Sequence, residues 1–540
     1  MKNKKFKIGI VLETFKVNKF DKQIIEKLSL DKNIDLVAIL TNKKFKKKNI
    51  TLIKILFFKF IFNLEKFLLQ FFFKELKELD KAHPININKF KKVINLKKIE
   101  EKNILSNKYD EVSKNNLDLI LTLGVDNIFK KKNLKISRLG VFSINYSNFK
   151  LDNNTPPGFW ETYLNKSETG FVFQLYNNKS NNENILFKGE FATKRFFSLN
   201  QYNLLRESGY FLVKTIKKIS TNQININNKK FITKSKIYEI PNIITLIKYL
   251  FIKITLFLTL FQKRIIFNKR QKWVINYSRD PFDKIDLKKS KIIKNPKDRY
   301  FADPFVFSHN NKKYIFVEDF FFKTKKGSIS VIEIDDNDKQ KIYEKVIDET
   351  FHMSFPFVFM YKHNLYMVPE TAGANSIRLY KCIKFPNKWK YCYDLISNIR
   401  SVDNLIINNG NKYYLLTSTS NYDDFSSKLE IYISNNPISK TWTPHVNNPV
   451  YFDLKKGRNG GIIFKNKEIF RACQTYGINT LGDNQYGNKL SINRINSLNQ
   501  KKFSEETILN IKPNFKKNLL GIHHLNGTDD FTVFDYCYYD

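Results

Sequence analysis

Acidic residues recur at matching places in the second half of the chain, and they are the residues best suited to acid–base chemistry. Asp303 and Asp403 each stand near the start of an apolar segment, and Glu370 ends another. Two or three carboxylates that face one substrate can supply a general acid and a general base, as in the cleavage of glycosidic bonds. We therefore predict Asp303, Glu370 and Asp403 as catalytic residues. The alternative is that both aspartates cap strands through hydrogen bonds to the backbone.

Other polar residues of the same segments are candidates for holding a substrate. Arginine binds phosphate and polar groups through several donors, and histidine titrates near neutral pH. Six of the seven histidines follow residue 300. The predicted substrate-binding residues are Glu318, His352, Arg458, Arg471, Gln474, His523 and Asn526.

The elements that must position these residues form a repeat. An apolar strand, a polar turn and a second strand recur in the segments 302–319, 354–371, 402–418, 460–477 and 521–538. Each segment therefore predicts a β-hairpin. Further strands are expected at 327–334, 376–382 and 428–434.

About four strands per repeat are typical of a propeller blade. We predict an all-β five-bladed β-propeller over residues 273–540. In such a fold the carboxylates would meet at a common rim or funnel. A β-sandwich of five hairpins is the alternative.

The first 200 residues have a different pattern, in which strand-like and helix-like segments alternate. The short apolar runs 7–12, 35–40, 117–123 and 140–146 are typical of buried parallel strands. This order predicts an α/β Rossmann-like domain over residues 1–200, with ligand sites at the carboxyl ends of the strands.

Two segments are almost wholly apolar. Residues 52–73 predict a helix with one polar stripe, which either packs on the sheet or contacts a membrane surface. Residues 241–261 are long enough to cross a bilayer at about 20 residues, but Lys248 and Lys253 disfavour a span. We expect this helix to lie at the membrane interface or between the domains.

The helical connector is predicted over residues 201–272. It includes a basic cluster at 263–272, which suits an anionic membrane surface.

Three segments of the first half, GVFSINYSN (140–148), PPGFWE (156–161) and a TG-led strand (169–189), are similar to the formyltransferase superfamily. That superfamily includes methionyl-tRNA and sugar-nucleotide N-formyltransferases. The resemblance implies transfer of a formyl group from 10-formyltetrahydrofolate to an amine, with an Asn, a His and an Asp in the active site.

The residues that carry this chemistry in the superfamily are replaced here. Its Asn and His fall on Ser143 and Asn145, or in a shifted register on Asn145 and Ser147, and Asn182 lies at the missing Asp-Gly turn. Serine and asparagine cannot accept a proton near neutral pH. We predict a degenerate formyltransferase site at Ser143, Asn145 and Asn182, with weak or absent binding of 10-formyltetrahydrofolate. The alternative is altered catalysis with Glu161 and Glu183 as substitute bases.

The second half resembles the N-terminal propeller domain of glucosamine inositolphosphorylceramide transferases. The motifs are FADPFVF (301–307), HMSFPFVF (352–359), SVDN (401–404), RNGG (458–461) and GIHHLN (521–526). Bacterial members of that family join a formyltransferase-like domain to such a propeller, and in plant members a separate domain carries glycosyl transfer. The resemblance implies a saccharide or glycolipid substrate.

Composition excludes several classes of protein. Hydrophobic residues make up 42% and aromatic residues 15%, which excludes a disordered chain. The net charge of +42 comes from lysines spread along the whole chain, together with many Asn, Ile and Phe residues, so we attribute it to an AT-rich coding sequence and predict no nucleic-acid partner. The four cysteines lack metal-binding spacing, and the N-terminus lacks a signal peptide. We predict a cytoplasmic protein without a metal site, with peripheral attachment to the inner membrane.

Together these patterns predict a transferase-like protein that synthesises or modifies a surface glycan or glycolipid. One alternative is a glycoside hydrolase or glycosyltransferase that uses the carboxylates of the second half. A non-catalytic glycan-binding protein is the other.

Overall fold

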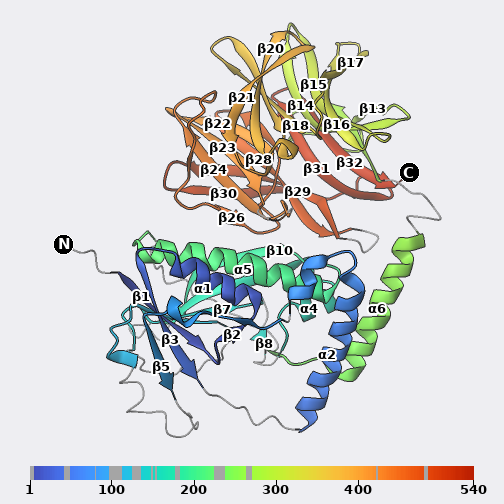
Figure 1. The fold of residues 1–540 in the computed structure, drawn as a ribbon. Helices are drawn as coiled ribbons and strands as arrows, with labels where there is room; N and C mark the ends of the chain where they lie inside the picture. The colour runs from blue at the N-terminus through green and yellow to red at the C-terminus, as the bar shows by residue number, and fades with distance from the viewer. Residues whose placement is uncertain are drawn as a thin grey trace. The chain divides into compact units, whose positions relative to one another are not determined.

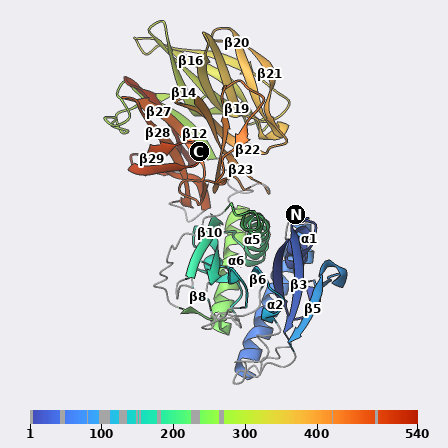
Figure 2. The same cartoon turned by 90° about the vertical axis from the view of Figure 1, so that its left-hand side faces the viewer.

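The computed structural model describes residues 5–41, 49–79, 81–96, 112–123, 136–147, 150–151, 155–176, 183–223, 237–262, 271–420, 422, 424–479 and 484–539. The chain divides into two compact units, Met1–Phe261 and Gln262–Asp540, called unit 1 and unit 2 below (Figure 1). Unit 1 mixes helices with one large sheet, whereas unit 2 is built of antiparallel β-sheets (Figure 2).

The sheet of unit 1 has seven strands in the order β10-β9-β7-β6-β1-β3-β5. The strands β7, β6, β1, β3 and β5 are parallel, and β9 and β10 add an antiparallel hairpin at one edge. The predicted strands at 7–12, 35–40, 117–123 and 140–146 are thereby confirmed as neighbours in one sheet. The bounds are β1 Phe6–Leu12, β3 Ile34–Thr41, β5 Lys92–Leu96, β6 Leu119–Thr122, β7 Val141–Asn145, β9 Glu168–Tyr176 and β10 Glu183–Ala192. Short pairs are β2 Lys16–Val17 with β4 His83–Pro84, and β8 Lys150–Leu151 with β11 Ile237–Tyr238.

Helices pack on this sheet through apolar stripes. In α1, Phe20, Ile24 and Leu28 recur at helical spacing and are buried, and Asn18 caps the first turn. The other helices of unit 1 are α2 Asn49–Leu69, α4 Phe159–Tyr163, α5 Phe197–Ser220 and α6 Ile243–Phe261; α1 spans Lys19–Ser29.

The boundary between the two units lies at a different place in the sequence from the predicted domain boundaries. Residues 201–220 continue α5, which contacts α1, α4 and β9, and α6 contacts α2, so the chain up to Phe261 belongs to unit 1. The predicted connector at 201–272 is therefore mostly part of unit 1, because α5 buries its apolar face there and α6 buries Leu246 and Tyr249. Among the helices that the structure describes, none has the length and apolarity required to cross a membrane.

Unit 2 contains four-stranded antiparallel groups. The first is β14 Arg299–His309, β15 Lys312–Phe321, β16 Lys326–Ile334 and β17 Gln340–Ile347. The second is β18 Ser354–Tyr361, β19 Asn364–Glu370, β20 Ser376–Lys384 and β21 Lys388–Ser397. The third is β22 Ser401–Asn409, β23 Lys412–Thr419, β24 Lys428–Ser434 and β25 Thr443–Pro444, with β26 Tyr451–Phe452 beside β24.

An eight-stranded sheet joins two more groups of four. One is β27 Asn459–Lys465, β28 Glu468–Ile478, β29 Asn484–Leu498 and β30 Phe503–Ile511. The other is β31 Leu519–Thr528, β32 Phe531–Tyr539, β12 Gln271–Ser278 and β13 Lys291–Ile293. A single pair, Ile463 with Gly527, connects the two groups. All five predicted hairpins are confirmed as antiparallel pairs.

The first strands of successive groups contact one another. β14 contacts β18, β18 contacts β22, β22 contacts β27, β27 contacts β31, and β31 contacts β14. The first strand of unit 2, β12, pairs along its whole length with the last, β32. The apolar core lies between the groups, because side chains from both faces of neighbouring sheets are buried there.

Candidate functional site in unit 2

The first strands of the groups carry β-bulges at matching places. The ladder shifts after Ala302 in β14, after Ser354 in β18 and after Val402 in β22. The residue that follows each shift has a positive φ: 51° at Asp303, 48° at Phe355 and 56° at Asp403. A bulge re-aims the side chain that it carries, and aspartate tolerates left-handed backbone better than most residues. The predicted equivalence of Asp303 and Asp403 is therefore a shared backbone feature.

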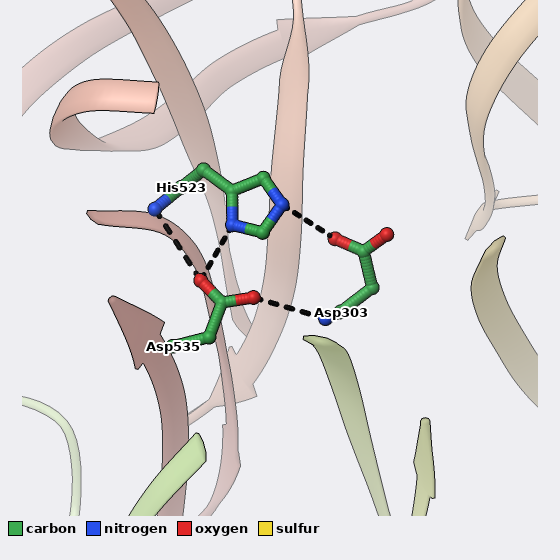
Figure 3. Close-up of side chains that lie close together, drawn as sticks. All are labelled: Asp303, His523 and Asp535. Atoms are coloured by element: carbon green, nitrogen blue, oxygen red, sulfur yellow. Dashed lines mark hydrogen bonds and ion pairs between the residues drawn. The ribbon is translucent and has the colours of Figure 1, made fainter. Parts of the chain in front are cut away.

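Asp303 meets a histidine and a second aspartate in the core of unit 2 (Figure 3). The Asp303 Oδ1 atom lies 3.2 Å from Nε2 of His523, and Nδ1 of His523 lies 2.6 Å from Oδ1 of Asp535. The backbone N–H of Asp303 donates to the other Asp535 oxygen at 2.9 Å. Both imidazole nitrogens thus face carboxylates, and all three side chains are buried.

Asp303 and His523 each stabilise the charged form of the other. Burial lowers the pKa of His523, but the carboxylates of Asp535 and Asp303 outweigh it and raise the pKa to about 10. Burial raises the pKa of Asp303, but the charge and hydrogen bond of His523 hold that pKa below its ordinary range. His523 is therefore an imidazolium at neutral pH, and its ring lies between the carboxyl groups of Asp303 and Asp535.

The same three residues offer donor atoms within 4.8 Å of one another, which is a spacing that could hold a metal ion. Each imidazole nitrogen, however, already faces a carboxylate oxygen at hydrogen-bond distance. A proton on each ring nitrogen satisfies this arrangement directly, so it fits an ion-paired imidazolium better than a cation site.

Aromatic rings hold His523 in place. The Trp273 ring stacks on the imidazole with centroids 3.7 Å apart, and Tyr486 approaches it edge-on. Next to Tyr486, a Cβ at Gly487 would lie 2.3 Å from the Cβ of His523. Glycine is therefore required where β29 passes this side chain.

Glu318 and Glu370 occupy matching positions on the second strands. Glu318 pairs with Ala302, which precedes Asp303, and Glu370 pairs with Ser354, which precedes Phe355. Both glutamates are buried. Burial, followed by the negative charge of Asp303, raises the pKa of Glu318, whereas burial and the charge of Asp403 raise the pKa of Glu370 to about 8. The structure thus favours the protonated form of Glu370 at neutral pH and shifts Glu318 in the same direction.

His352 lies beside Glu318 and is partly exposed. Its Nε2 atom is 3.6 Å from Oε1 of Glu318, and its Nδ1 atom accepts the backbone N–H of Gly327 at 2.9 Å. Because Nδ1 is an acceptor, a neutral His352 carries its proton on Nε2, toward the glutamate.

Asp403 is held by an arginine and a glutamine. Arg458 Nε donates to Oδ2 of Asp403 at 2.6 Å, and Nε2 of Gln474 donates to the same oxygen at 3.2 Å. Burial raises the pKa of Asp403, and the Arg458 guanidinium opposes this. The Arg458 side chain also lies over the Tyr486 ring, 4.9 Å from its centre. Arg458 therefore connects the second aspartate to the aromatic rings around His523.

Most of the predicted residues thus belong to one group, called the carboxylate cluster below. Its ionisable members influence one another's pKa across different sheets. Its members are Asp303, Glu318, His352, Glu370, Asp403, Arg458, Gln474 and His523.

Arg471 and Asn526, both predicted as substrate-binding residues, make contacts within the fold. Arg471 is fully buried, and its guanidinium binds Glu505 at 2.6 Å and Asn459 at 2.9 Å. Asn526 accepts the backbone N–H of Val306 at 2.9 Å and donates to the carbonyl of Ile462. Among the described residues, neither contacts a carboxylate of the cluster, and both connect strands of unit 2.

Three residues of the site were missed by sequence analysis. Asp535 lies in the last strand among aromatic residues, and Trp273 and Tyr486 resemble ordinary strand residues. The contact of Trp273 with His523 depends on the pairing of β12 with β32, which no local pattern predicts, whereas Asp535 contacts His523 within the predicted hairpin of β31 and β32.

The predicted site in unit 1 is separate. Ser143 is buried in β7, Asn145 is half-buried at the end of that strand, and Asn182 lies outside the described residues. The Ser147 hydroxyl donates to Glu161 at 2.6 Å, and burial raises the pKa of Glu161. Ser147, which stands where the superfamily has its histidine in the shifted register, thus contacts the proposed substitute base Glu161. The backbone of Glu183 begins β10.

Residues 287–532, within unit 2, match the family described as "Glucosamine inositolphosphorylceramide transferase 1, N-terminal". Glucosamine inositolphosphorylceramide transferase 1 of Arabidopsis thaliana is 32% identical over 216 residues, which are 38% of this chain and 27% of that protein. The protein of the same name from Oryza sativa subsp. japonica is 30% identical over 212 residues, with the same coverage. This chain spans about a quarter of the length of these relatives, which are plant proteins and not the bacterial members considered from the sequence.

Solved structures show weaker likeness. The catalytic domain of the GH62 α-L-arabinofuranosidase of Coprinopsis cinerea has a TM-score of 0.33 and 11% identity, covering 44% of this chain and 90% of that chain. The sugar 3N-formyl transferase WlaRD has a TM-score of 0.26 and 17% identity, covering 43% and 69%. At these scores the resemblance of the first 200 residues to formyltransferases stays a prediction. The similarity that is established concerns unit 2 and the N-terminal part of glucosamine inositolphosphorylceramide transferase 1.

Proposed function

We propose that unit 2 binds a saccharide at the carboxylate cluster, and that the chain takes part in the synthesis or modification of a glycan or glycolipid. The observation that carries this proposal is the placement of Asp303 and Asp403 at matching bulges of two sheets, where Asp303 lies 3.2 Å from His523 and Asp403 accepts from Arg458 at 2.6 Å. Glu370 of a third sheet is buried, and burial and the charge of Asp403 raise its pKa to about 8. Burying several like charges together is costly for a fold, and such clusters of perturbed carboxylates are typical of functional sites.

We also infer that the five strand groups are the blades of a β-propeller. The closed series of contacts among the first strands supports this, as does the pairing of β12 with β32. In a propeller the first strands surround the axis, so residues at matching bulges converge. That geometry explains how Asp303 and Asp403, a hundred residues apart, influence each other's ionisation.

The edge of the cluster offers groups that suit a sugar. Arg458 and His352 are partly exposed and can donate hydrogen bonds, and the Tyr486 ring is 38% exposed. Aromatic rings pack against the apolar faces of sugar rings while polar groups bind the hydroxyls. The relatives' name, which refers to a glycolipid transferase, points to the same class of substrate.

A second candidate function is acid–base catalysis on a glycosidic bond. The pKa of Asp303 is lowered whereas that of Glu370 is raised to about 8, so one is ionised and the other protonated at neutral pH. Two carboxyl groups with pKa values driven apart are the usual division between base and acid. If Glu370 is the general acid, turnover should decline above about pH 8, where Glu370 loses its proton. Turnover should also be lost in Glu370→Gln, while saccharide affinity is retained.

The test of saccharide binding starts from a glycan array probed with the full chain. The strongest saccharide is then titrated calorimetrically against wild type, Asp303→Asn and Asp403→Asn, with a melting temperature for each protein. Asp319→Asn is the matched control, because Asp319 is the buried neighbour of Glu318 but bonds to Ser330 and Arg299 instead.

We expect at least about a tenfold loss of affinity in the two cluster variants, corresponding to one lost charged hydrogen bond. Asp319→Asn should lower the melting temperature and leave affinity unchanged. Unchanged affinity in Asp303→Asn and Asp403→Asn, or no saccharide bound by the wild type, would refute the proposal. Affinity lost without any turnover would select the non-catalytic alternative.

A further inference from the structure

Helix α2 of unit 1 exposes a continuous apolar stripe. The members are spaced by three or four residues, which places them on one face of the helix. Each is between 42 and 63% exposed: Ile53, Leu56, Phe60, Leu64 and Phe67. The opposite face, with Phe58, Ile61 and Phe62, is buried in unit 1. The helix is thus apolar on both sides, although only one side is covered.

Helix α6 has the same property. Its exposed residues also follow a spacing of three and four and are between 53 and 69% exposed: Ile244, Ile247, Phe251, Ile254 and Leu258. Leu246 and Tyr249 on the other side are buried. The two helices contact each other, as their neighbouring ribbons show (Figure 1).

A buried polar network fixes the rotation of both helices. Glu65 of α2 accepts hydrogen bonds from the backbone N–H and hydroxyl of Ser198 at 2.7 and 2.6 Å. Tyr249 of α6 donates to the other Glu65 oxygen and accepts the N–H of Phe197 at 2.9 Å. If either helix rotated to bury its exposed stripe, the Glu65 carboxylate and the Tyr249 hydroxyl would lose their hydrogen-bond partners in the interior. The apolar stripes are therefore a fixed surface.

The charged residues of the two helices that are not buried are all lysines. Among the side chains that the structure describes, the acidic residue of α2 and α6 is Glu65, which is buried. The other charged residues are Lys54, Lys59, Lys66, Lys248 and Lys253, all half-buried or exposed. A second copy on this face would bring lysines against lysines, whereas an anionic surface complements them.

We propose that the exposed faces of α2 and α6, called the two-helix face, bind the surface of a bilayer that contains anionic lipids. Leucine, isoleucine and phenylalanine enter the boundary between headgroups and acyl chains, and the lysines extend to the lipid phosphates. The helices lie on the membrane and do not cross it. This inference does not depend on the saccharide proposal, and its test is separate.

The test uses the full chain in sedimentation with vesicles. Vesicles of phosphatidylcholine alone are compared with vesicles that contain phosphatidylglycerol, at low and high salt. One variant carries Leu56→Gln, Phe60→Gln and Phe67→Gln; its control carries Ile383→Gln and Val446→Gln, which are equally exposed residues of unit 2. A second variant carries Lys59→Gln and Lys248→Gln, and its control carries Lys388→Gln and Lys390→Gln.

We expect binding to the anionic vesicles that high salt weakens. The apolar variant should partition at least about tenfold less, and the lysine variant about 25-fold less, since each lysine near an anionic leaflet contributes about fivefold. The control variants should bind like wild type, and thermal unfolding should show that all variants are folded.

Two results would overturn the proposal. One is absence of vesicle binding by the wild type, or equal binding by the apolar variant. The other is concentration-dependent self-association without lipid that the apolar variant abolishes, since this would assign the two-helix face to a second copy.

Discussion

His523 is the residue whose charge state depends most clearly on its surroundings. Asp303 and Asp535 face its two ring nitrogens, and Trp273 covers the ring. A histidine enclosed in this way cannot change partners, so it fixes the orientation of the Asp303 carboxylate. We regard His523 as a positioning residue for the cluster.

Replacing His523 should change how stability depends on pH. The pKa of His523 is about 10 in the fold, above its ordinary value of 6.5, so its stabilisation is complete below about pH 6.5 and is lost as the pH rises through 10. Within this window the advantage of wild type over His523→Gln should shrink by about 1.4 kcal/mol per pH unit. Denaturant unfolding of both proteins at several pH values measures this. An advantage that does not vary with pH would show that His523 is neutral in the fold.

At the scale of elements, asparagines connect the first strands to the neighbouring groups. Asn404 donates to the carbonyl of Pro369 at 3.1 Å and accepts from Thr417 at 2.7 Å. Asn459 donates to the carbonyl of Asp403 at 2.7 Å. These bonds tie adjacent sheets together beside the bulges that carry the site.

Asn404→Ala should lower the free energy of unfolding by about 1–3 kcal/mol, because the buried carbonyl of Pro369 loses this donor and the hydroxyl of Thr417 keeps only the carbonyl of Val402 as acceptor. Asn408→Ala, in the exposed end of the same strand, is the control and should change it by less than about 0.5 kcal/mol. Urea unfolding followed by tryptophan fluorescence measures both. Equal stability of the two variants would contradict the role of Asn404 as a connection between sheets.

The hairpins of unit 2 could be predicted because each is a local pattern of apolar strands around a polar turn. The matching places of Asp303 with Asp403 and of Glu318 with Glu370 followed from stacking those patterns. Arg471 shows the limit: its segment resembles the others, but its burial against Glu505 depends on where β30 packs. Asp535 lies in the same predicted hairpin as His523, but its contact with Asp303 joins strands that are distant in sequence, so its place in the site could not be assigned.

At the scale of the whole molecule, the chain joins two units with separate cores and separate candidate chemistry. Unit 1 has the parallel sheet that the sequence pattern indicates, but its predicted formyl-transfer positions hold a buried Ser143 and a half-buried Asn145. Unit 2 holds the ionised and protonated carboxyl groups. Our proposal therefore places saccharide binding in unit 2.

Titration of the full chain with 10-formyltetrahydrofolate should give weak or no binding, because serine and asparagine replace the groups that handle protons. Calorimetry measures the affinity, and an assay with an amino sugar detects formyl transfer. Glu161→Gln is the informative variant. Tight binding with transfer that Glu161→Gln abolishes would show that unit 1 is an active enzyme with Glu161 as the substitute base.

The location of the bound saccharide tests the central claim most directly. A crystal structure of the full chain with the tightest-binding saccharide of the array measures it. We predict sugar density within hydrogen-bond distance of Arg458 and of at least two of Asp303, Glu370 and Asp403. Density in unit 1, or on the outer strands of unit 2 with the carboxylate cluster unliganded, would show that the carboxylate cluster is not the saccharide site.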